Sequence, residues 1–126
     1  MVSDDLTTRT GDTNLSSAGP IRPPGWDLLA RAILQRRTIT ADYHGHTRLL
    51  CPHLLGWKNG RARVLSYQAS GSTSQGALNP DPNQRWRWML VEDIQHAAIT
   101  DHPWQSAPNY RPGGTVIDTI EIAVPP

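Results

Sequence analysis

The spacing of apolar residues changes abruptly near residue 38, and this change constrains the fold more than any other feature of the sequence. Over residues 26–37 the apolar positions recur at i, i+3, i+4 and i+7, which predicts one amphipathic helix. From residue 38 onward, apolar and polar residues alternate with a period of two, which predicts short, half-buried strands. We therefore expect one helix followed by several consecutive strands.

Turn signals divide the region after residue 38 into strands. Asn59-Gly60 is the strongest short hairpin signal, and His44-Gly45-His46 is a second turn. Pro52 lies within a strand, so that strand is expected to bend there or to lie at a sheet edge. The predicted strands cover 38–43, 47–57, 61–69, 85–91, 94–100 and 115–124, the last with Ile120, Ile122 and Val124 on its buried face.

One helix followed by the five consecutive short strands between residues 38 and 100 predicts a mainly β fold, specifically a small Sm/SH3-like antiparallel barrel. Closing the barrel would remove the exposed edges of such a short sheet. We divide the chain into a polar, Pro-rich lead-in at 1–25, expected to be disordered, a barrel domain at 26–104, and a linker with the C-terminal strand at 105–126. A long polar loop is expected at 70–84, where it could serve a function.

The single cysteine, Cys51, can form no intrachain disulfide, which suits a reducing compartment. Residues 1–21 are acidic and contain no apolar run, so we expect neither a signal peptide nor a transit peptide. No stretch approaches the roughly 18 apolar residues of a membrane span. The sequence therefore predicts a cytoplasmic protein with no membrane association.

Charge is distributed unevenly although the formal net charge is only +1. Ten of the 12 lysine and arginine residues lie within residues 22–88, whereas that region holds only three of the 11 acidic residues. A basic middle with acidic flanks is typical of a protein that binds an anionic ligand. A solvated surface with chance clustering of charge would give the same pattern, and both interpretations stay open.

Three motifs suggest more specific chemistry. His44 and His46 could form a metal pair, but a metal site needs three or four ligands, so we expect no metal and no other cofactor. Cys51 and His53 could form a nucleophile–base pair in a small hydrolase, although a buried structural cysteine is the default. Trp86 and Trp88 alternate with arginines, which fits a base-stacking surface, but a core position is favoured.

Residues 29–104 resemble the WYL family, bacterial ligand-sensing domains with an Sm/SH3-like barrel. The resemblance is carried by Ala32 to Arg37 leading into Tyr43, then Arg48, Pro52, Asn59-Gly60, Leu65-Ser66-Tyr67, Arg87 and Val91 to Ile94. The tripeptide that names the family falls on Ala62-Arg63-Val64, and Leu90 and Asp93 stand where the family has basic residues. The resemblance implies binding of nucleic acids or nucleotide-like signals through a basic groove.

We therefore predict a non-catalytic accessory or sensor module for an anionic ligand, such as single-stranded DNA or RNA or a nucleotide. Arginines would contact phosphate groups, with Arg63 beside Arg85 or Arg87, while aromatic side chains would stack or donate hydrogen bonds. One alternative is a protein-interaction subunit that docks through strand 115–124 on a partner or in a homodimer. The candidate ligand-binding residues are Tyr43, Arg48, His53, Arg63, Tyr67, Gln75, Arg85 and Arg87.

Overall fold

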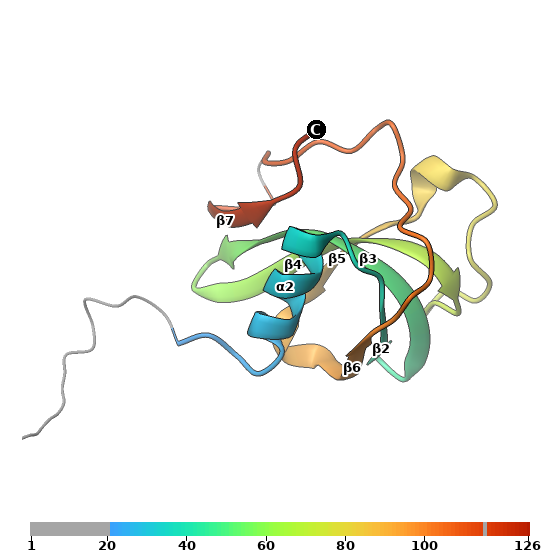
Figure 1. Cartoon of the computed structure of the whole chain (residues 1–126), viewed down its shortest axis with the longest axis horizontal. Helices are drawn as coiled ribbons and strands as arrows, with labels where there is room; N and C mark the ends of the chain where they lie inside the picture. The colour runs from blue at the N-terminus through green and yellow to red at the C-terminus, as the bar shows by residue number, and fades with distance from the viewer. Residues whose placement is uncertain (1–20, 115) are drawn as a thin grey trace, which may run out of the picture.

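The computed structural model describes residues 21–114 and 116–126, and within these ranges the fold is mainly β (Figure 1). One α-helix is accompanied by six antiparallel strands in a single sheet. Two short 3-10 helices, η2 and η3, flank β5. The elements are α2 (Trp26–Gln35), β2 (Ile39–Tyr43), β3 (His46–Lys58), β4 (Arg61–Gly71), η2 (Pro82–Gln84), β5 (Trp86–Leu90), η3 (Val91–Asp93), β6 (Ile94–Ile99) and β7 (Thr119–Ala123).

All six predicted strands are present, with ends that differ from the prediction by a few residues. The helix ends at Gln35, two residues earlier than predicted. Arg36 adopts a left-handed backbone conformation with φ of 49°, and its N–H bonds to the carbonyls of Ala32 and Ile33. This left-handed cap closes the last turn of the helix and stops it.

Both predicted turns form, and both have the backbone conformation that their sequences favour. Asn59 and Gly60 have φ of 52° and 75°, and His44 and Gly45 have φ of 50° and 80°. Two successive positive φ values are the mark of a type I′ hairpin turn, whose twist matches that of the flanking strands. The two turns fix the pairing of β2 with β3 and of β3 with β4.

The sheet is not a closed barrel. Its strands are ordered β5-β4-β3-β2-β6, with β7 paired to β3, so β5 and β6 stand at opposite ends without pairing to each other. The three residues of η3 carry the chain directly from β5 into β6 rather than turning it back as a hairpin. The mainly β prediction is therefore confirmed, while the closure that we expected from sequence is not observed.

Strand β3 changes partners at Pro52. Before this residue β3 pairs with β2, after it β3 pairs with β7 from Leu54 to Trp57, and β4 runs along its other side. The register with β4 also shifts between Pro52 and Leu54. Because proline has no N–H to donate to a ladder, it fits the changeover between two neighbours. The irregularity that we expected at Pro52 is therefore observed as a change of partner and a shift of register.

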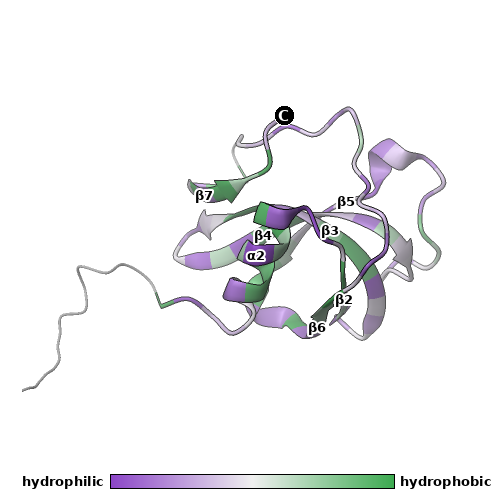
Figure 2. Ribbon diagram, in the orientation of Figure 1, coloured by the Kyte–Doolittle hydropathy of each residue, from purple (hydrophilic) through white to green (hydrophobic). Residues whose placement is uncertain are grey.

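Helix α2 packs its apolar face on the sheet, which gives the main core. Trp26, Leu29 and Ile33 are buried, and the Trp26 ring stacks on Trp57 with centroids 5.1 Å apart. Burying side chains of this size contributes roughly 1.5–3 kcal/mol each. Figure 2 shows hydrophobic residues on α2, β3 and β7 where these elements face one another. Within the described ranges, no helix has the length and apolar character needed to cross a membrane.

Strand β7 pairs with β3 of its own chain. Ile122 lies opposite Leu55 and is half-buried, and Val124 is buried, as predicted. Ile120 is 39% exposed, so its predicted burial is wrong. The register shifts between Leu55 and Gly56, and this irregularity breaks the simple alternation that the prediction assumed.

Most of the predicted disordered lead-in, residues 1–20, lies outside the described residues. Its last part is described and contacts the rest of the chain. Arg22 lies 5.1 Å from the centre of the Trp26 ring and forms an ion pair of 2.8 Å with Glu121 on β7.

Candidate anion-binding site

The most unusual residue of the sheet is Arg48, a buried arginine on β3. Only 4% of its surface is exposed. Its guanidinium donates a long hydrogen bond of 3.4 Å to Gln68 Oε1 and one of 3.2 Å to the Tyr43 carbonyl. Its Nε is buried and has no hydrogen-bond partner among the described residues. Much of the donor capacity of this side chain is therefore unused.

No negative charge compensates Arg48 within the described residues, where its guanidinium contacts only neutral groups. The guanidinium lies 5.3 Å from the centre of the Tyr43 ring, which is a cation–π contact. Burial, and secondarily the positive charge of Arg87, lower the pKa of Arg48 below its ordinary value. A buried charge without a counter-ion destabilises a fold, so an anion bound beside Arg48 would stabilise the folded protein.

A second cation, Arg87 on β5, approaches from the neighbouring part of the same sheet face. Arg87 is the cross-strand partner of Ser66 on β4, and opposed residues share a face. Gln68, the partner of Arg48 in a hydrogen bond, lies two residues from Ser66 and on that face too. The buried Oγ of Ser66 has no hydrogen-bond partner among the described residues. The sheet face that carries Arg87 therefore also carries a buried hydroxyl that the described protein groups do not satisfy.

These residues line a hollow of about 270 Å³ at the surface of the sheet. The loop after β4 covers one side of it. The lining consists of Tyr43, Arg48, Thr73, Ser74, Gln75 and Arg87. Four of the eight predicted ligand-binding residues, Tyr43, Arg48, Gln75 and Arg87, are thus brought together. The serines around Gln75, which include Ser74, were expected from the sequence to cap such a site because of the length of the loop. Thr73 was not singled out from the sequence.

The loop that covers the hollow is held by its own hydrogen bonds. Thr73 and Gly76 exchange two backbone hydrogen bonds of 2.9 Å, and the Thr73 hydroxyl accepts from the Gln75 N–H at 3.1 Å. The Gln68 side-chain amide donates to the carbonyls of Ser70 and Ser72. Gln68 therefore connects the buried Arg48 to the loop, and the loop contributes a fixed wall to the site.

Two other predicted site residues lie away from this hollow. Arg63 pairs across the sheet with Leu90, three residues from Ser66, so it lies on the face opposite to Arg87. Arg85 donates from Nε to the Asn79 carbonyl at 2.8 Å and lies against the loop. The prediction that Arg63 lies beside Arg85 or Arg87 is therefore wrong, because the register places the Arg63 side chain on the other face.

The remaining two predicted residues, His53 and Tyr67, belong to an aromatic cluster. His53 is fully buried and contacts the rings of Trp86, Trp104 and Tyr110. Tyr67 packs edge-on against Trp86, whose ring also stacks on Tyr110. This packing favours the core interpretation of Trp86 over a base-stacking surface. His53 and Tyr67 stabilise the fold behind the site rather than lining the hollow.

The neighbours of Cys51 give no support to a cysteine hydrolase. Burial raises the pKa of the Cys51 thiol to about 11, so the thiolate is rare at neutral pH. Its sulfur accepts a hydrogen bond from the Gln105 N–H at 3.4 Å. His53 donates from Nδ1 to the Cys51 carbonyl at 2.7 Å and accepts at Nε2 from the Ser106 hydroxyl at 2.9 Å. Both ring nitrogens are therefore engaged with atoms other than the Cys51 sulfur.

The contact between His53 and Ser106 has the geometry of a serine and its base, but the electrostatics oppose this role. Burial lowers the pKa of His53 to about 4. Forming the imidazolium there costs about 3 kcal/mol more than in water, by the conversion of 1.36 kcal/mol per pKa unit. A base with so low a pKa activates a hydroxyl poorly. The pair is better explained as two polar groups that satisfy each other beside the aromatic cluster.

The two turn histidines point to different partners. His44 bonds to Asp93 at 3.1 Å, and His46 bonds to the Ser72 hydroxyl at 2.9 Å. Across residues 21–114 and 116–126, no group of three or more His, Cys, Asp or Glu residues has a geometry that could hold a metal ion.

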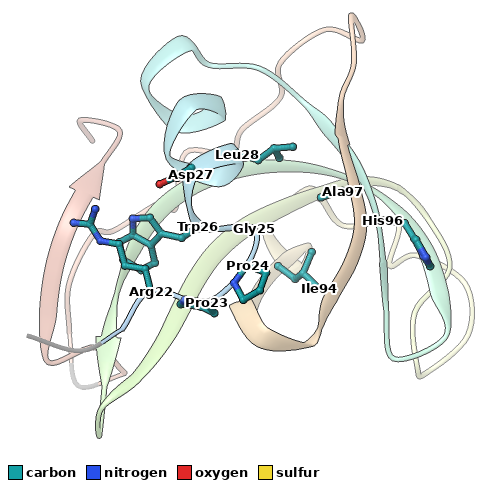
Figure 3. A pocket seen from close by; sticks show the side chains of 10 residues that line it. All are labelled: Arg22, Pro23, Pro24, Gly25, Trp26, Asp27, Leu28, Ile94, His96 and Ala97. Atoms are coloured by element: carbon teal, nitrogen blue, oxygen red, sulfur yellow. The ribbon is translucent and has the colours of Figure 1, made fainter. Parts of the chain in front are cut away.

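A larger hollow of about 830 Å³ lies between residues 22–28 and β6 (Figure 3). Its one arginine, Arg22, lies over Trp26 in that view and is paired with Glu121. Because its basic group is already neutralised, this hollow offers less to an anion than the Arg48 hollow.

Part of the basic charge that is evident in the sequence is neutralised by the fold. Four cations from the basic middle form ion pairs with acidic residues from the C-terminal third, at N–O distances of 2.8 to 3.2 Å. The pairs are Arg22–Glu121, Arg37–Asp101, Lys58–Asp118 and Arg61–Glu92. The uneven charge distribution is thus in part an intramolecular complementarity, and Arg48 and Arg87 are not among the four paired cations.

Comparison with protein-family models, curated proteins and solved structures found no match to this chain. The resemblance to the WYL family gains no support from these comparisons and stays a prediction.

Proposed function

We propose that this protein is a non-catalytic binding module that holds a small anion between Arg48 and Arg87. The observation that carries the proposal is the buried Arg48 guanidinium, which has an unused Nε and no counter-ion among the described residues. Such a group is expensive to bury and is compensated best by a bound negative charge. The module would act as a cytoplasmic accessory or sensor, in keeping with the sequence-based expectation.

A phosphate group fits the lining of the hollow best. The lining offers two guanidinium groups, the hydroxyl of Ser74 and the amide of Gln75, and it includes no carboxylate. The Tyr43 hydroxyl accepts from the Leu90 N–H at 3.1 Å, which leaves its own proton available for donation. Phosphate presents several acceptor oxygens to such a set of donors, and arginine matches its geometry by bidentate contacts.

A small ligand is favoured over an extended nucleic-acid strand. Strand binding requires a positively charged groove that follows the backbone over several nucleotides. In the described part of the chain, four of the surface cations are paired with carboxylates, and Arg63 lies on the opposite face from Arg87. A hollow of about 270 Å³ suits one phosphate-bearing group of a small molecule.

Isothermal titration calorimetry with inorganic phosphate tests the proposal. We expect saturable binding that the Arg87→Gln variant weakens by at least tenfold, which corresponds to about 1.4 kcal/mol. Arg31→Gln is the matched control, because Arg31 is exposed on α2 and its loss changes the net charge equally. Equal affinities for Arg87→Gln and Arg31→Gln would refute a specific site and indicate general charge attraction.

A further inference from the structure

We infer that the ligand is a nucleoside monophosphate, whose base occupies a second hollow beside the Arg48 hollow. This inference rests on the proposed function, because it places the phosphate group of that ligand between Arg48 and Arg87. It goes further by assigning the uncharged part of the ligand to the loop between β4 and β5.

The second hollow has a volume of about 490 Å³ and adjoins the first. The two hollows share three lining residues, Thr73, Gln75 and Arg87. The rest of the second lining comes from residues 77–80 and Gln84. Because Gln75 and Arg87 face both spaces, a molecule with a phosphate in the first hollow has its remaining part directed into the second.

The lining of the second hollow differs chemically from that of the first. Its only charged residue is Arg87, and Leu78 and Pro80 contribute apolar surface. The side-chain amides of Gln75 and Gln84 make no hydrogen bond to any described residue. Each amide offers both a donor and an acceptor, which is the pattern that pairs with the edge of a nucleobase.

Arg87 connects the two parts of the proposed ligand site. Its Nη1 donates to the carbonyls of Gln84 and Trp86 at 3.0 and 2.9 Å, so the position of the guanidinium is set by the backbone of η2 and β5. A guanidinium that is fixed in this way can contact a phosphate through its edge. Its planar face is a surface on which nucleobases stack.

The wall of the second hollow is built before any ligand arrives. Asp81 caps η2 by accepting from the Asn83 N–H at 3.0 Å, and the Asn79 side chain accepts from the Asp81 N–H at 2.9 Å. Arg85 binds the Asn79 carbonyl from the other side at 2.8 Å. These bonds hold residues 79–85 in one conformation, so binding would require little ordering of the loop.

Calorimetric titration of the full chain with a graded set of compounds tests this inference. The set contains inorganic phosphate, ribose 5-phosphate and the monophosphates of adenosine, guanosine, cytidine and uridine. We expect at least one nucleoside monophosphate to bind ten times more tightly than ribose 5-phosphate. The Gln84→Ala variant should lose most of that factor while its affinity for inorganic phosphate stays unchanged. Gln35→Ala, at the exposed end of α2, is the matched control and should behave as the native protein.

The outcomes separate this inference from the proposed function. If inorganic phosphate binds and all the phosphate esters bind with that same affinity, the second hollow is not a subsite, whereas the anion site stands. If ribose 5-phosphate binds as tightly as every nucleotide, recognition of the base is refuted. If none of the compounds binds, the proposed function fails and this inference fails with it.

Discussion

Replacing Arg48 with methionine separates a functional role of this arginine from a structural one. In the described structure the guanidinium is buried, makes two long hydrogen bonds and meets no carboxylate. Methionine has a similar length and can fill the same space without a charge. Replacing buried charges by apolar residues of similar volume is often neutral or stabilising by about 1–4 kcal/mol.

We expect Arg48→Met to raise the free energy of unfolding by about 1–2 kcal/mol in phosphate-free buffer, which is the lower part of that range because Gln68 and the Tyr43 carbonyl lose a donor. For a domain of this size the thermal midpoint would rise by roughly 3–8 °C. Added phosphate should reverse the order. At one hundred times its dissociation constant, phosphate stabilises the native protein by about 2.7 kcal/mol and leaves the variant unchanged.

Thermal unfolding followed by circular dichroism, in buffer with and without phosphate, provides the measurement. The Arg31→Gln variant serves as the control for net charge and should respond to phosphate as the native protein does. A loss of more than about 2 kcal/mol for Arg48→Met without ligand would place Arg48 among the structural residues. The argument from an uncompensated buried charge would then be wrong.

Three further predictions concern the fold around the site. Because burial raises the pKa of Cys51 to about 11, a thiol reagent should label the native protein at pH 7.5 only as fast as the chain unfolds, and rapid labelling would contradict this. His53 has a pKa of about 4 when folded against 6.5 when unfolded, so the unfolded chain binds the extra proton. Its contribution is present above pH 6.5 and is lost as the pH falls toward 4, by about 2 kcal/mol between pH 7.5 and 5. Urea unfolding at both pH values would show this, and a flat profile would refute it. Ile122→Asp should destabilise the protein by about 2 kcal/mol or more, because it puts a charge opposite Leu55, whereas Ile120→Asp should cost under about 1 kcal/mol. Equal effects in urea titrations would show that β7 does not pack as described.

Local sequence determined the elements of this protein because their signals act over a few residues. The helix follows from apolar spacing, and the hairpin at Asn59-Gly60 follows from two residues that tolerate positive φ. The change of partner at Pro52 is consistent with its missing N–H. Arg48 and Arg87 were also candidate ligand contacts, because arginine suits phosphate and both residues belong to the stretch that resembles the WYL family.

Tertiary structure alone decided which of the candidate residues meet. The register between β4 and β5 puts Arg87 opposite Ser66 and Arg63 opposite Leu90, and a difference of three residues along a strand places them on opposite faces. The same long-range strand pairing places His53 and Tyr67 in an aromatic cluster, away from the hollow. Sequence patterns carry no information on the register between distant strands. They therefore could not predict which of the candidate residues meet at the site.

The distribution of charge shows most clearly what the sequence determined and what the tertiary structure decided. The sequence determined that the middle of the chain is basic and its C-terminal third acidic. Only the fold decided that Arg22, Lys58 and Arg61 meet carboxylates from that third, while the Arg48 guanidinium is left without one among the described residues. The physical reason is that an ion pair depends on distances of about 4 Å in space, and these distances are set by strand pairing rather than by position along the chain.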